Sequence, residues 1–326
     1  MQRVVHVIKS NPEFRSRLRI MRGWDGSDEA VCFSEKGAWR RLTKLAREPV
    51  TLVFHQQASL PFLIALRLWV GDGFRAVYDI ADANEWKPGD SLYRRVRNVA
   101  LHLMEWFVFQ FDIEYTTVSR GLRYVYFKRF GKSPRIAMNI PSNVLTDEEI
   151  EAPPEGQKRA IHFGQLHPIR LSMSAIDRLH ELGYALDLWG VVVQDMTYED
   201  RLKAHPMYEA GKLRLRGPFT SDDLSFIQGY DFMVQSVQHV EAINYRFGMP
   251  NKFIQSSLMG VPSVLSHNMR EIRVRFPGLI LDMQDVENGT FDVDRVKLAR
   301  GVRALGVSSK REYLAAIGRE PVGVKP

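Results

Sequence analysis

The amino-acid sequence predicts an α/β protein with two Rossmann-like, doubly wound domains that face each other across a cleft. Three observations predict this fold. Short apolar runs, each long enough for one buried strand, alternate with amphipathic helical stretches along the chain. An acidic, proline-containing stretch interrupts this alternation near the middle, and the alternation restarts after it. The length of 326 residues also suits two domains.

Five apolar runs in the first half are predicted to be strands: Val4–Ile8, Val50–Phe54, Arg75–Asp79, Ile113–Val118 and Arg135–Asn139. The stretches Leu60–Val70 and Leu92–Phe111 lie between them and have helical periodicity. Strands that alternate with helices are typical of a parallel sheet covered on both faces. We expect this sheet to form an N-terminal domain at residues 1–146.

The stretch 147–158 is predicted to be a linker, because it is acidic and polar and contains two prolines. Residues 159–326 then form the second domain, and we expect its last helix to pack back on the N-terminal domain. In doubly wound folds, ligands bind outside the carboxyl ends of the strands. The two domains therefore predict a ligand cleft between them.

The second half repeats the alternation of strands and helices. Its predicted strands are Ala160–Gly164, Ala185–Trp189, Leu213–Arg216, Phe232–Val234, Ser263–Leu265 and Leu279–Leu281. Its clearest helices are Met173–Leu182 and Pro250–Met259. Each is followed by a glycine, Gly183 or Gly260, and glycine suits the end of a helix.

Composition narrows the function classes. The single cysteine, Cys32, excludes an intramolecular disulfide framework and fits a reducing compartment. No apolar run approaches the roughly 18 residues that span a bilayer, and the N-terminus lacks the pattern of a secretory signal. We therefore expect a cytoplasmic protein.

Charge is unevenly distributed along the chain. Residues 1–146 carry 23 Lys and Arg against 14 Asp and Glu, a balance of +9, and residues 147–326 carry 22 against 24, a balance of −2. The basic half predicts either an anionic partner, such as the inner membrane surface, or a solvated basic surface. No aromatic–basic recognition motif appears, so we expect no nucleic-acid partner.

Two segments of the first half are candidates for membrane contact. The better candidate follows the first strand and includes Arg15, Arg17, Arg19, Arg22 and Trp24. The aromatic stretch Leu101–Phe111 is the second. We expect this stretch to be buried between sheet and solvent instead.

Several segments, in the same order, resemble retaining bacterial GT-B glycosyltransferases that build cell-surface polysaccharides (glycosyltransferase family 4). In the first half, Arg75–Asp82 resembles that family's "VYD" strand and loop, and Tyr115–Arg120 resembles its "ITVS" strand. Arg135–Pro141 resembles its "VIPN" strand.

The second half resembles the family more closely. Ile161–Leu166 is similar to its "FVGRL" opening, and Leu186–Gly190 to its "L-x-I-x-G" strand. Gly217–Phe219 and Tyr230–Ser236 are similar to its next two motifs. The segment from Phe247 to Val264 is similar to "LPNKLFEYLAAGVPVV".

The resemblance implies the GT-B fold and a hexosyltransferase activity. A sugar would pass from a UDP- or GDP-linked donor to a glycan or lipid-linked acceptor in exopolysaccharide, capsule or lipopolysaccharide biosynthesis. No cofactor is implied beyond the donor substrate. By their places in the motifs, the implied donor contacts are Gly164, Gln165, Gly190, Phe219, Ser236, Asn251, Lys252, Gln255 and Ser256.

Two positions depart from the family pattern. Many retaining members carry two glutamates eight positions apart in the last motif, where this chain has Phe247 and Gln255. The arginine that usually follows the glycine of "FVGRL" is Gln165, although Arg170 lies nearby. These departures keep open a non-catalytic alternative, in which the chain binds nucleotide or glycan as a scaffold.

Lys252 is the first candidate for catalysis. It follows Pro250 and Asn251 at the predicted start of a helix, where the helix dipole favours an anion and a lysine gains nothing without one. A diphosphate leaving group would supply that anion, and Lys252 would stabilise the charge as it develops. The alternative is a solvent-exposed lysine.

Gly164 and Arg170 are the next candidates. A glycine at the end of a strand permits close approach of a ligand, and an arginine binds a diphosphate with two donors. The alternative is a loop glycine beside a surface arginine. Gln255 and Ser256 lie one turn beyond Lys252, where they are placed to bond ribose or sugar hydroxyls.

On the acceptor side, His55 and Asp79 each end a predicted strand. Either could face the cleft, and Asp79 or Asp82 could orient an acceptor hydroxyl or act as a base. The alternatives are a core histidine and a structural cap. His162 and His167 flank a loop without a cysteine partner, so we expect no metal site.

A second enzyme class shares this architecture, the sugar-nucleotide 2-epimerases. They are expected to cluster acidic and histidine residues in the cleft, which the sequence does not show clearly.

Overall fold

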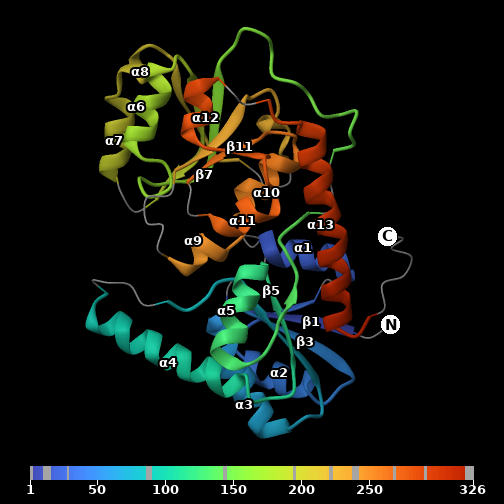
Figure 1. Ribbon diagram of the computed structural model, residues 1–326. Coiled ribbons are helices and arrows are strands. Elements are labelled where there is room, and N and C mark those ends of the chain that lie inside the picture. Colours follow the sequence, from blue (N-terminus) through green and yellow to red (C-terminus); the bar gives the residue numbers. More distant parts are fainter. Residues whose placement is uncertain are drawn as a thin grey trace. The chain divides into compact units, whose positions relative to one another are not determined.

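The computed structural model describes residues 3–9, 16–27, 29–85, 90–141, 145–193, 196–219, 223–236, 242–266, 269–289 and 292–319. The chain divides into two compact units, drawn in Figure 1. Unit 1 consists of Met1–Ser142, Ala242–Gly248 and Leu305–Pro326, and unit 2 of Asn143–Glu241 and Met249–Ala304. Residues 145–158 contain no helix or strand. The domain boundaries 1–146, 147–158 and 159–326 remain predictions.

Unit 1 contains a six-stranded parallel sheet, sheet A, in the order β2-β1-β3-β4-β5-β6. The strands are β1 (Arg3–Ile8), β2 (Ala30–Cys32), β3 (Val50–His55), β4 (Arg75–Ile80), β5 (Glu114–Thr117) and β6 (Arg135–Ile136). Their Val- and Ile-rich interiors are buried, as expected for a parallel sheet with helices on both faces. The strand order reverses between β1 and β3.

The helices of unit 1 are α1 (Ser16–Asp25), α2 (Ala38–Leu45), the short η2 (Gln57–Ser59), α3 (Leu60–Val70), α4 (Leu92–Val108), α5 (Arg120–Phe130) and α9 (Ile243–Phe247). The core between sheet A and α2, α3, α4 and α5 is centred on aliphatic side chains of β1, β3 and β4. A stacked aromatic group of Phe109, Tyr115, Tyr126 and Phe130 closes one end of this core.

Unit 2 contains a second six-stranded parallel sheet, sheet B, in the order β12-β11-β10-β7-β8-β9. The strands are β7 (Arg159–Leu166), β8 (Ala185–Val192), β9 (Leu213–Gly217), β10 (Phe232–Gln235), β11 (Ser263–Leu265) and β12 (Ile280–Leu281). The strand order reverses between β7 and β10. A ligand of such a sheet is expected at this switch point.

The helices of unit 2 are α6 (Met173–Glu181), α7 (Met196–Lys203), α8 (Pro206–Glu209), the short η3 (Ser225–Ile227), α10 (Asn251–Leu258), α11 (Arg270–Arg275) and α12 (Met283–Asn288). In Figure 1, α6, α7 and α8 lie together along one side of sheet B. The long α13 (Arg295–Ala316) begins in unit 2, and from Leu305 its residues belong to unit 1. There, Tyr313 donates a hydrogen bond of 2.6 Å to Asp25.

The α/β prediction with two parallel sheets is confirmed, and every strand expected from an apolar run is present within a few residues. The segment after the first strand was predicted to be the better candidate for membrane contact, which requires exposed side chains. This prediction is wrong, because the segment forms α1 and packs on unit 1. Arg17 and Trp24 are buried in unit 1, and Arg19 and Arg22 are half-buried. Arg15 lies outside the described residues.

The stretch Leu101–Phe111 was expected to be buried, and only part of it is. Val108 and Phe109 are buried in the core of unit 1, but Trp106 and Phe107 are exposed. The helix ends at Val108 rather than Phe111. Only the face with Leu101, Glu105 and Val108 is buried against the unit. None of the described helices combines the length and the apolar character needed to cross a membrane.

Candidate functional site

The candidate site of unit 2 lies at the switch point of sheet B. β7 ends there with Gly164, Gln165 and Leu166, and β10 ends with Gln235 beside Ser236. The first turn of α10 reaches the same point, because the Lys252 side chain passes next to Gly164. Residues far apart in sequence thus meet where a doubly wound sheet binds its ligand.

Lys252, the second residue of α10, is buried, with 7% of its surface exposed. Its Nζ lies 3.2 Å from Nε2 of His162. His162 Nδ1 lies 2.7 Å from the carbonyl oxygen of Val234, which can only accept, so Nδ1 carries the proton and Nε2 accepts from the lysine. Among the described residues, no carboxylate pairs with Lys252.

This environment opposes a charge on Lys252. Burial, followed by repulsion from Arg170, lowers the pKa of Lys252 well below 10.5. Burial, followed by the charge of Lys252, lowers the pKa of His162 as well, which keeps the imidazole neutral. The site therefore holds an arginine, a lysine whose protonation is disfavoured and a neutral imidazole, and an incoming anion would favour the protonated form of the lysine.

Two glycines allow the close packing around Lys252, one beside the lysine and the other on the neighbouring strand. A Cβ at Gly164 would lie 2.5 Å from Cε of Lys252, so any larger residue at this position displaces the side chain. Gly190, its register partner on β8, has φ +138°, and a Cβ there would lie 1.8 Å from the carbonyl oxygen of Gly164. Gly190 is thus needed for the close approach of the two strands, whatever a ligand contributes.

The other predicted donor residues lie in varied surroundings. Gln165 is exposed, while Arg170, Ser236, Asn251 and Gln255 are half-buried. The Ser236 hydroxyl accepts a hydrogen bond of 3.0 Å from the backbone N–H of Ser172, which ties the β10 loop to the start of α6.

Ser256 differs from these residues because it is fully buried. Its hydroxyl lies 2.9 Å from that of Ser263 and donates to the backbone of Phe253. In this structure Ser256 joins α10 to β11, and its hydroxyl does not face solvent.

Phe219 belongs to an aromatic group at the carboxyl side of β7 and β8. Its ring centroid lies 5.0 Å from that of Phe226 and 5.9 Å from that of Phe163. Trp189 joins the group with a centroid distance of 4.6 Å to Phe226. Phe219, Phe226 and Trp189 are half-buried, so their rings remain partly open for stacking.

Gln235 is a functional candidate that sequence reasoning missed. It is the last residue of β10 and only 3% exposed, yet its Oε1 has no hydrogen-bond partner among the described residues. Unsatisfied buried oxygens of this kind are rare in folded proteins. The only sequence signal was its position before Ser236 in a motif, which gives no information about pairing.

In unit 1, His55 and Asp79 lie together at the carboxyl ends of β3 and β4. Nδ1 of His55 donates to Asp79 at 2.9 Å, and Arg17 donates to both carboxylate oxygens. Thr116 donates a further bond of 2.7 Å. Burial alone would raise the pKa of Asp79, but the charge and hydrogen bonds of Arg17, with those of His55, hold it well below its usual range.

Asp79 is therefore a fully buried, fully bonded carboxylate that orients His55. The other ring nitrogen of His55 lies 2.8 Å from Nδ1 of His6, whose own Nε2 contacts Ser27 at 2.9 Å and Asp25 at 3.2 Å. Burial lowers the pKa of His6 to about 4. Sequence reasoning did not find His6 or Asp25, because they are 19 residues apart and no sequence motif indicates that their side chains meet.

Phe247 belongs to the core of unit 1. Its side chain packs against Gly121, where a Cβ would lie 2.6 Å from the Phe247 Cβ. Its carbonyl oxygen accepts a hydrogen bond from Ser119, the N-cap of α5. The position that the sequence resemblance matched to a glutamate is thus an apolar packing position in this chain.

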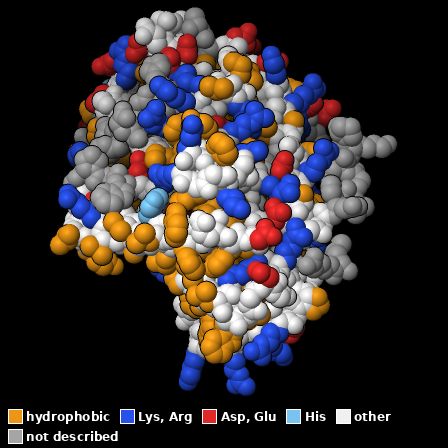
Figure 2. Space-filling view, turned by 60° about the horizontal axis from the view of Figure 1, so that its bottom comes forward, with side chains coloured by type: hydrophobic (Ala, Val, Ile, Leu, Met, Phe, Trp, Pro, Cys, Tyr) orange, Lys and Arg blue, Asp and Glu red, His pale blue; other side chains and the backbone are white. Residues whose placement is uncertain are grey.

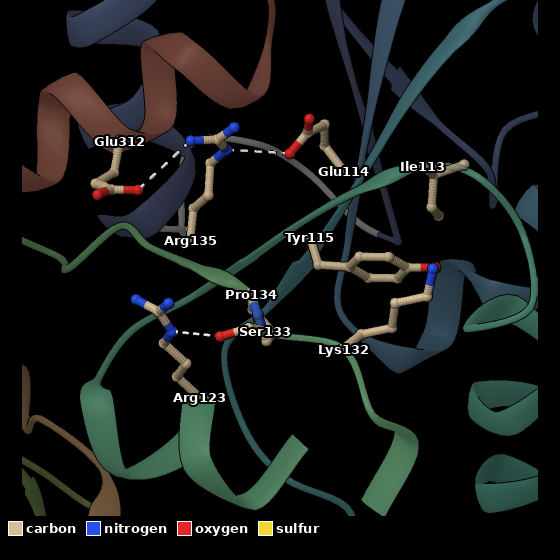
Figure 3. Close-up of a pocket in the computed structure, with 9 residues that line it drawn as sticks. All are labelled: Ile113, Glu114, Tyr115, Arg123, Lys132, Ser133, Pro134, Arg135 and Glu312. Atoms are coloured by element: carbon tan, nitrogen blue, oxygen red, sulfur yellow. Dashed lines mark hydrogen bonds and ion pairs between the residues drawn. The ribbon is translucent and has the colours of Figure 1, made fainter. Parts of the chain in front are cut away.

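A cavity of about 340 Å³ lies elsewhere in unit 1, at the amino ends of β5 and β6. Figure 3 shows Arg135 between Glu114 and Glu312, at 3.1 and 3.8 Å. Arg123 donates to Ser133 at 2.6 Å across the opening. These charges largely satisfy one another, and the cavity lies at the edge of sheet A opposite to the carboxyl ends.

No protein-family model and no curated protein matches the sequence. Solved structures do match the fold over nearly the whole chain. HepE from Anabaena, in complex with UDP, matches with a TM-score of 0.70 and 12% identity over 97% of this chain and 98% of its own. The lipopolysaccharide outer core galactosyltransferase WaaB gives a TM-score of 0.69 and 12% identity, covering 97% and 99%.

AviGT4, a glycosyltransferase involved in avilamycin A biosynthesis, matches with a TM-score of 0.62 and 12% identity over 98% of this chain and 97% of its own. At these identities the likeness concerns the fold. The chain has the GT-B fold of these glycosyltransferases, two parallel α/β sheets with a switch point in each.

Proposed function

We propose that the chain is a metal-independent glycosyltransferase that moves a sugar from a UDP- or GDP-linked donor to a glycan or lipid-linked acceptor, with retention of configuration. One observation carries the proposal: the Lys252 side chain is buried, with no anionic partner among the described residues, at the switch point of a doubly wound sheet. The known binding of UDP by HepE, which has the same fold, supports UDP as the first donor nucleotide to test.

The donor diphosphate fits this site for electrostatic reasons. Burying an uncompensated ammonium is costly, and an anion between Lys252 and Arg170 removes that cost. The amino end of α10 adds the backbone N–H groups of its first turn and the positive end of its dipole. As the sugar leaves, negative charge grows on the diphosphate, and Lys252 is placed to stabilise it.

The remaining donor contacts follow from the surroundings of Lys252. Gln235 offers an unpaired oxygen, and Gln255 lies one turn along α10, so both suit ribose or sugar hydroxyls. Phe219 and Trp189 suit stacking of the base. On the acceptor side His55 and Asp79 stay candidates from the sequence, and the structure adds no support for them, because the ring nitrogens of the buried His55 are bonded to Asp79 and His6.

Turnover is tested by incubating the purified protein with UDP- and GDP-linked sugars, after a thermal-shift panel has identified the nucleotide. A nucleotide at about 100 times its dissociation constant should stabilise the protein by roughly 2.7 kcal/mol. Donor consumption should be unchanged by a chelator, because Lys252 and a helix terminus take the place of the cation that other folds use. Complete loss of turnover that Mg²⁺ or Mn²⁺ restores would contradict metal independence.

A second candidate is nucleotide binding without turnover, as in a scaffold protein. Phe247 favours it, because this position is packed in unit 1 and carries no carboxylate. Donor consumption distinguishes the two candidates. Both predict nucleotide binding that depends on Lys252, and only the first predicts that the donor is consumed. The buried His6–His55–Asp79 cluster gives no support to an epimerase, since its members bond to one another below the surface.

Binding of the nucleotide should take up a proton. The pKa of Lys252 is lowered by burial in the free protein and should rise beside a bound diphosphate. Between these two pKa values the lysine gains a proton on binding, so the affinity should weaken as the pH rises. Calorimetry at several pH values above the last phosphate pKa of about 6, in buffers of different ionisation enthalpy, should detect the uptake of up to one proton on binding.

The matched control for this titration is Lys252→Met, which keeps a similar volume and cannot be protonated. Equal proton uptake by the two proteins would assign the proton to another group and remove this support for the site.

A further inference from the structure

Helix α4 (Leu92–Val108) has two opposite apolar faces, and only one of them packs on unit 1. The inner face carries Leu101, Glu105 and Val108, all buried. Glu105 holds this face in place by accepting a hydrogen bond of 2.8 Å from Tyr126, with a longer one from Tyr78. The inner face therefore fixes which side of α4 is turned away from the unit.

The outer face carries an apolar stripe made of Leu92, Val96, Val99, Leu103 and Trp106, here called the outer stripe. Their exposed fractions are 78, 61, 40, 59 and 53%. Successive members are four, three, four and three residues apart, which keeps them on one side of a helix. Single exposed apolar residues are ordinary on protein surfaces, whereas a continuous row along 17 helical residues indicates an interaction surface.

Neighbouring helices extend the apolar surface. Leu68 and Trp69, at the end of α3, are 70 and 71% exposed, and α3 packs against α4. Tyr124 and Phe127 on α5 are also exposed. Figure 2 shows hydrophobic side chains gathered in a band on this face, with basic side chains at its margins.

The exposed charges on the helices that carry and flank the outer stripe are positive. Two acidic residues just outside these helices pair with two of the cations, Asp90 with Arg94 and Asp72 with the buried Arg67. Helices α3, α4 and α5 together contain eight Lys and Arg (one, three and four) and one acidic residue, Glu105, which is buried. Arg94, Arg95 and Arg97 are exposed on α4 itself. A second copy of this chain would bring the same positive charge against the stripe, so like-charge repulsion opposes self-association here.

We propose that the outer stripe of α4 docks on an anionic phospholipid surface. The helix is about 25 Å long at 1.5 Å per residue and lies in the interface, with its apolar side chains among the acyl chains and its arginines among the headgroups. Trp106 and Tyr93 suit the boundary between the two layers. This inference does not depend on sugar transfer.

The test is co-sedimentation of the full chain with vesicles of phosphatidylcholine alone and with about a third phosphatidylglycerol. We expect at least about tenfold stronger binding to the anionic vesicles, which high salt weakens. Val96→Asp and Leu103→Asp should each weaken binding about tenfold, because each replaces an inserted apolar side chain by a charge. Both residues are exposed, so the melting temperature should not change.

Val274→Asp is the matched control. Val274 is 83% exposed on α11 of unit 2, and the substitution changes the net charge by the same amount as Val96→Asp. Binding by this variant should stay within about twofold of the parent. The proposal is overturned if the vesicles do not bind the protein, if neutral and anionic vesicles bind it equally, or if Val96→Asp and Val274→Asp behave alike. It is also overturned if size-exclusion chromatography shows a dimer that only Val96→Asp dissociates, because the stripe would then serve a second copy.

Discussion

Replacing Lys252 by methionine should lower turnover by on the order of 10²-fold, as removal of a transition-state donor does in other enzymes. The lysine lies at the proposed diphosphate site beside Gly164, and its contribution should grow as charge accumulates on the leaving group. Methionine ends at Cε, one atom short of the lysine Nζ, so it keeps the packing next to Gly164 without the amine. Steady-state kinetics with the identified donor measures the effect.

The same substitution should make the unliganded protein more stable. Lys252 is buried without an anion, so its folded-state pKa is lowered and the unfolded chain binds the proton more readily. The resulting penalty is absent above the unfolded pKa of 10.5 and grows as the pH falls, until the pH reaches the folded-state pKa. Removing the lysine removes this penalty, so the melting temperature should rise by about 2–4 °C per kcal/mol at neutral pH, and by less at high pH.

Lys203→Met is the control for both effects. Lys203 lies on α7 of the same unit, is half exposed, and pairs with Glu199 one turn away. Its replacement should change neither turnover nor stability by a measurable amount. A Lys252→Met variant that melts several degrees lower while retaining near-normal turnover would make Lys252 a structural residue.

Replacing Gly190 by alanine should disrupt unit 2 far more than an ordinary glycine substitution. The added Cβ would lie 1.8 Å from the carbonyl oxygen of Gly164, and φ is +138°. Backbone cannot move aside as a side chain does, so β7 and β8 must separate. We expect a loss on the order of 3 kcal/mol or more, hence a melting temperature at least about 6 °C lower, with loss of nucleotide binding.

Gly183→Ala separates backbone strain from the steric clash. Gly183 follows α6 in the same unit with φ +79°, and a Cβ there meets nothing within 4 Å. This control should cost only about 1 kcal/mol. If the two alanine variants melt at the same temperature, β7 and β8 do not approach as closely as the structure has them.

The fold was largely predictable because its main signals are local. Runs such as Val50–Phe54 and Phe232–Val234 are apolar for the length of one strand, and buried parallel strands need little else. Helix α1 was harder to predict, since its three arginines and its tryptophan were interpreted as a candidate for membrane contact. Arg17 is buried through its ion pair with Asp79, 62 residues away, and local sequence does not encode that contact.

The candidate site was predictable only in part. The spacing of Pro250, Asn251 and Lys252 placed a lysine at the start of a helix, and the structure has it there. Its burial and its contact with His162 depend on two segments 90 residues apart, so the sequence left a solvent-exposed lysine as the alternative. For the same reason, the unpaired oxygen of Gln235 emerges only once its neighbours are in place.

The faces of α4 show the same limit. The periodicity of Leu92–Phe111 identified a helix, but two apolar stripes on opposite sides look alike in sequence. The buried stripe is recognised by its packing on unit 1, and the outer stripe by its exposure.

The diphosphate site is tested most directly by calorimetric titration of the protein with UDP, UMP and uridine, and with the guanosine series in parallel. The diphosphate should bind at least about tenfold more tightly than the monophosphate, because it gains charge-assisted contacts to Lys252 and Arg170. In Lys252→Met the preference should shrink to about twofold, while Lys203→Met keeps it in full. Equal affinities of the diphosphate and the monophosphate for the unmodified protein, or a Lys252→Met variant that retains the whole preference, would contradict the assignment of Lys252 to the donor diphosphate.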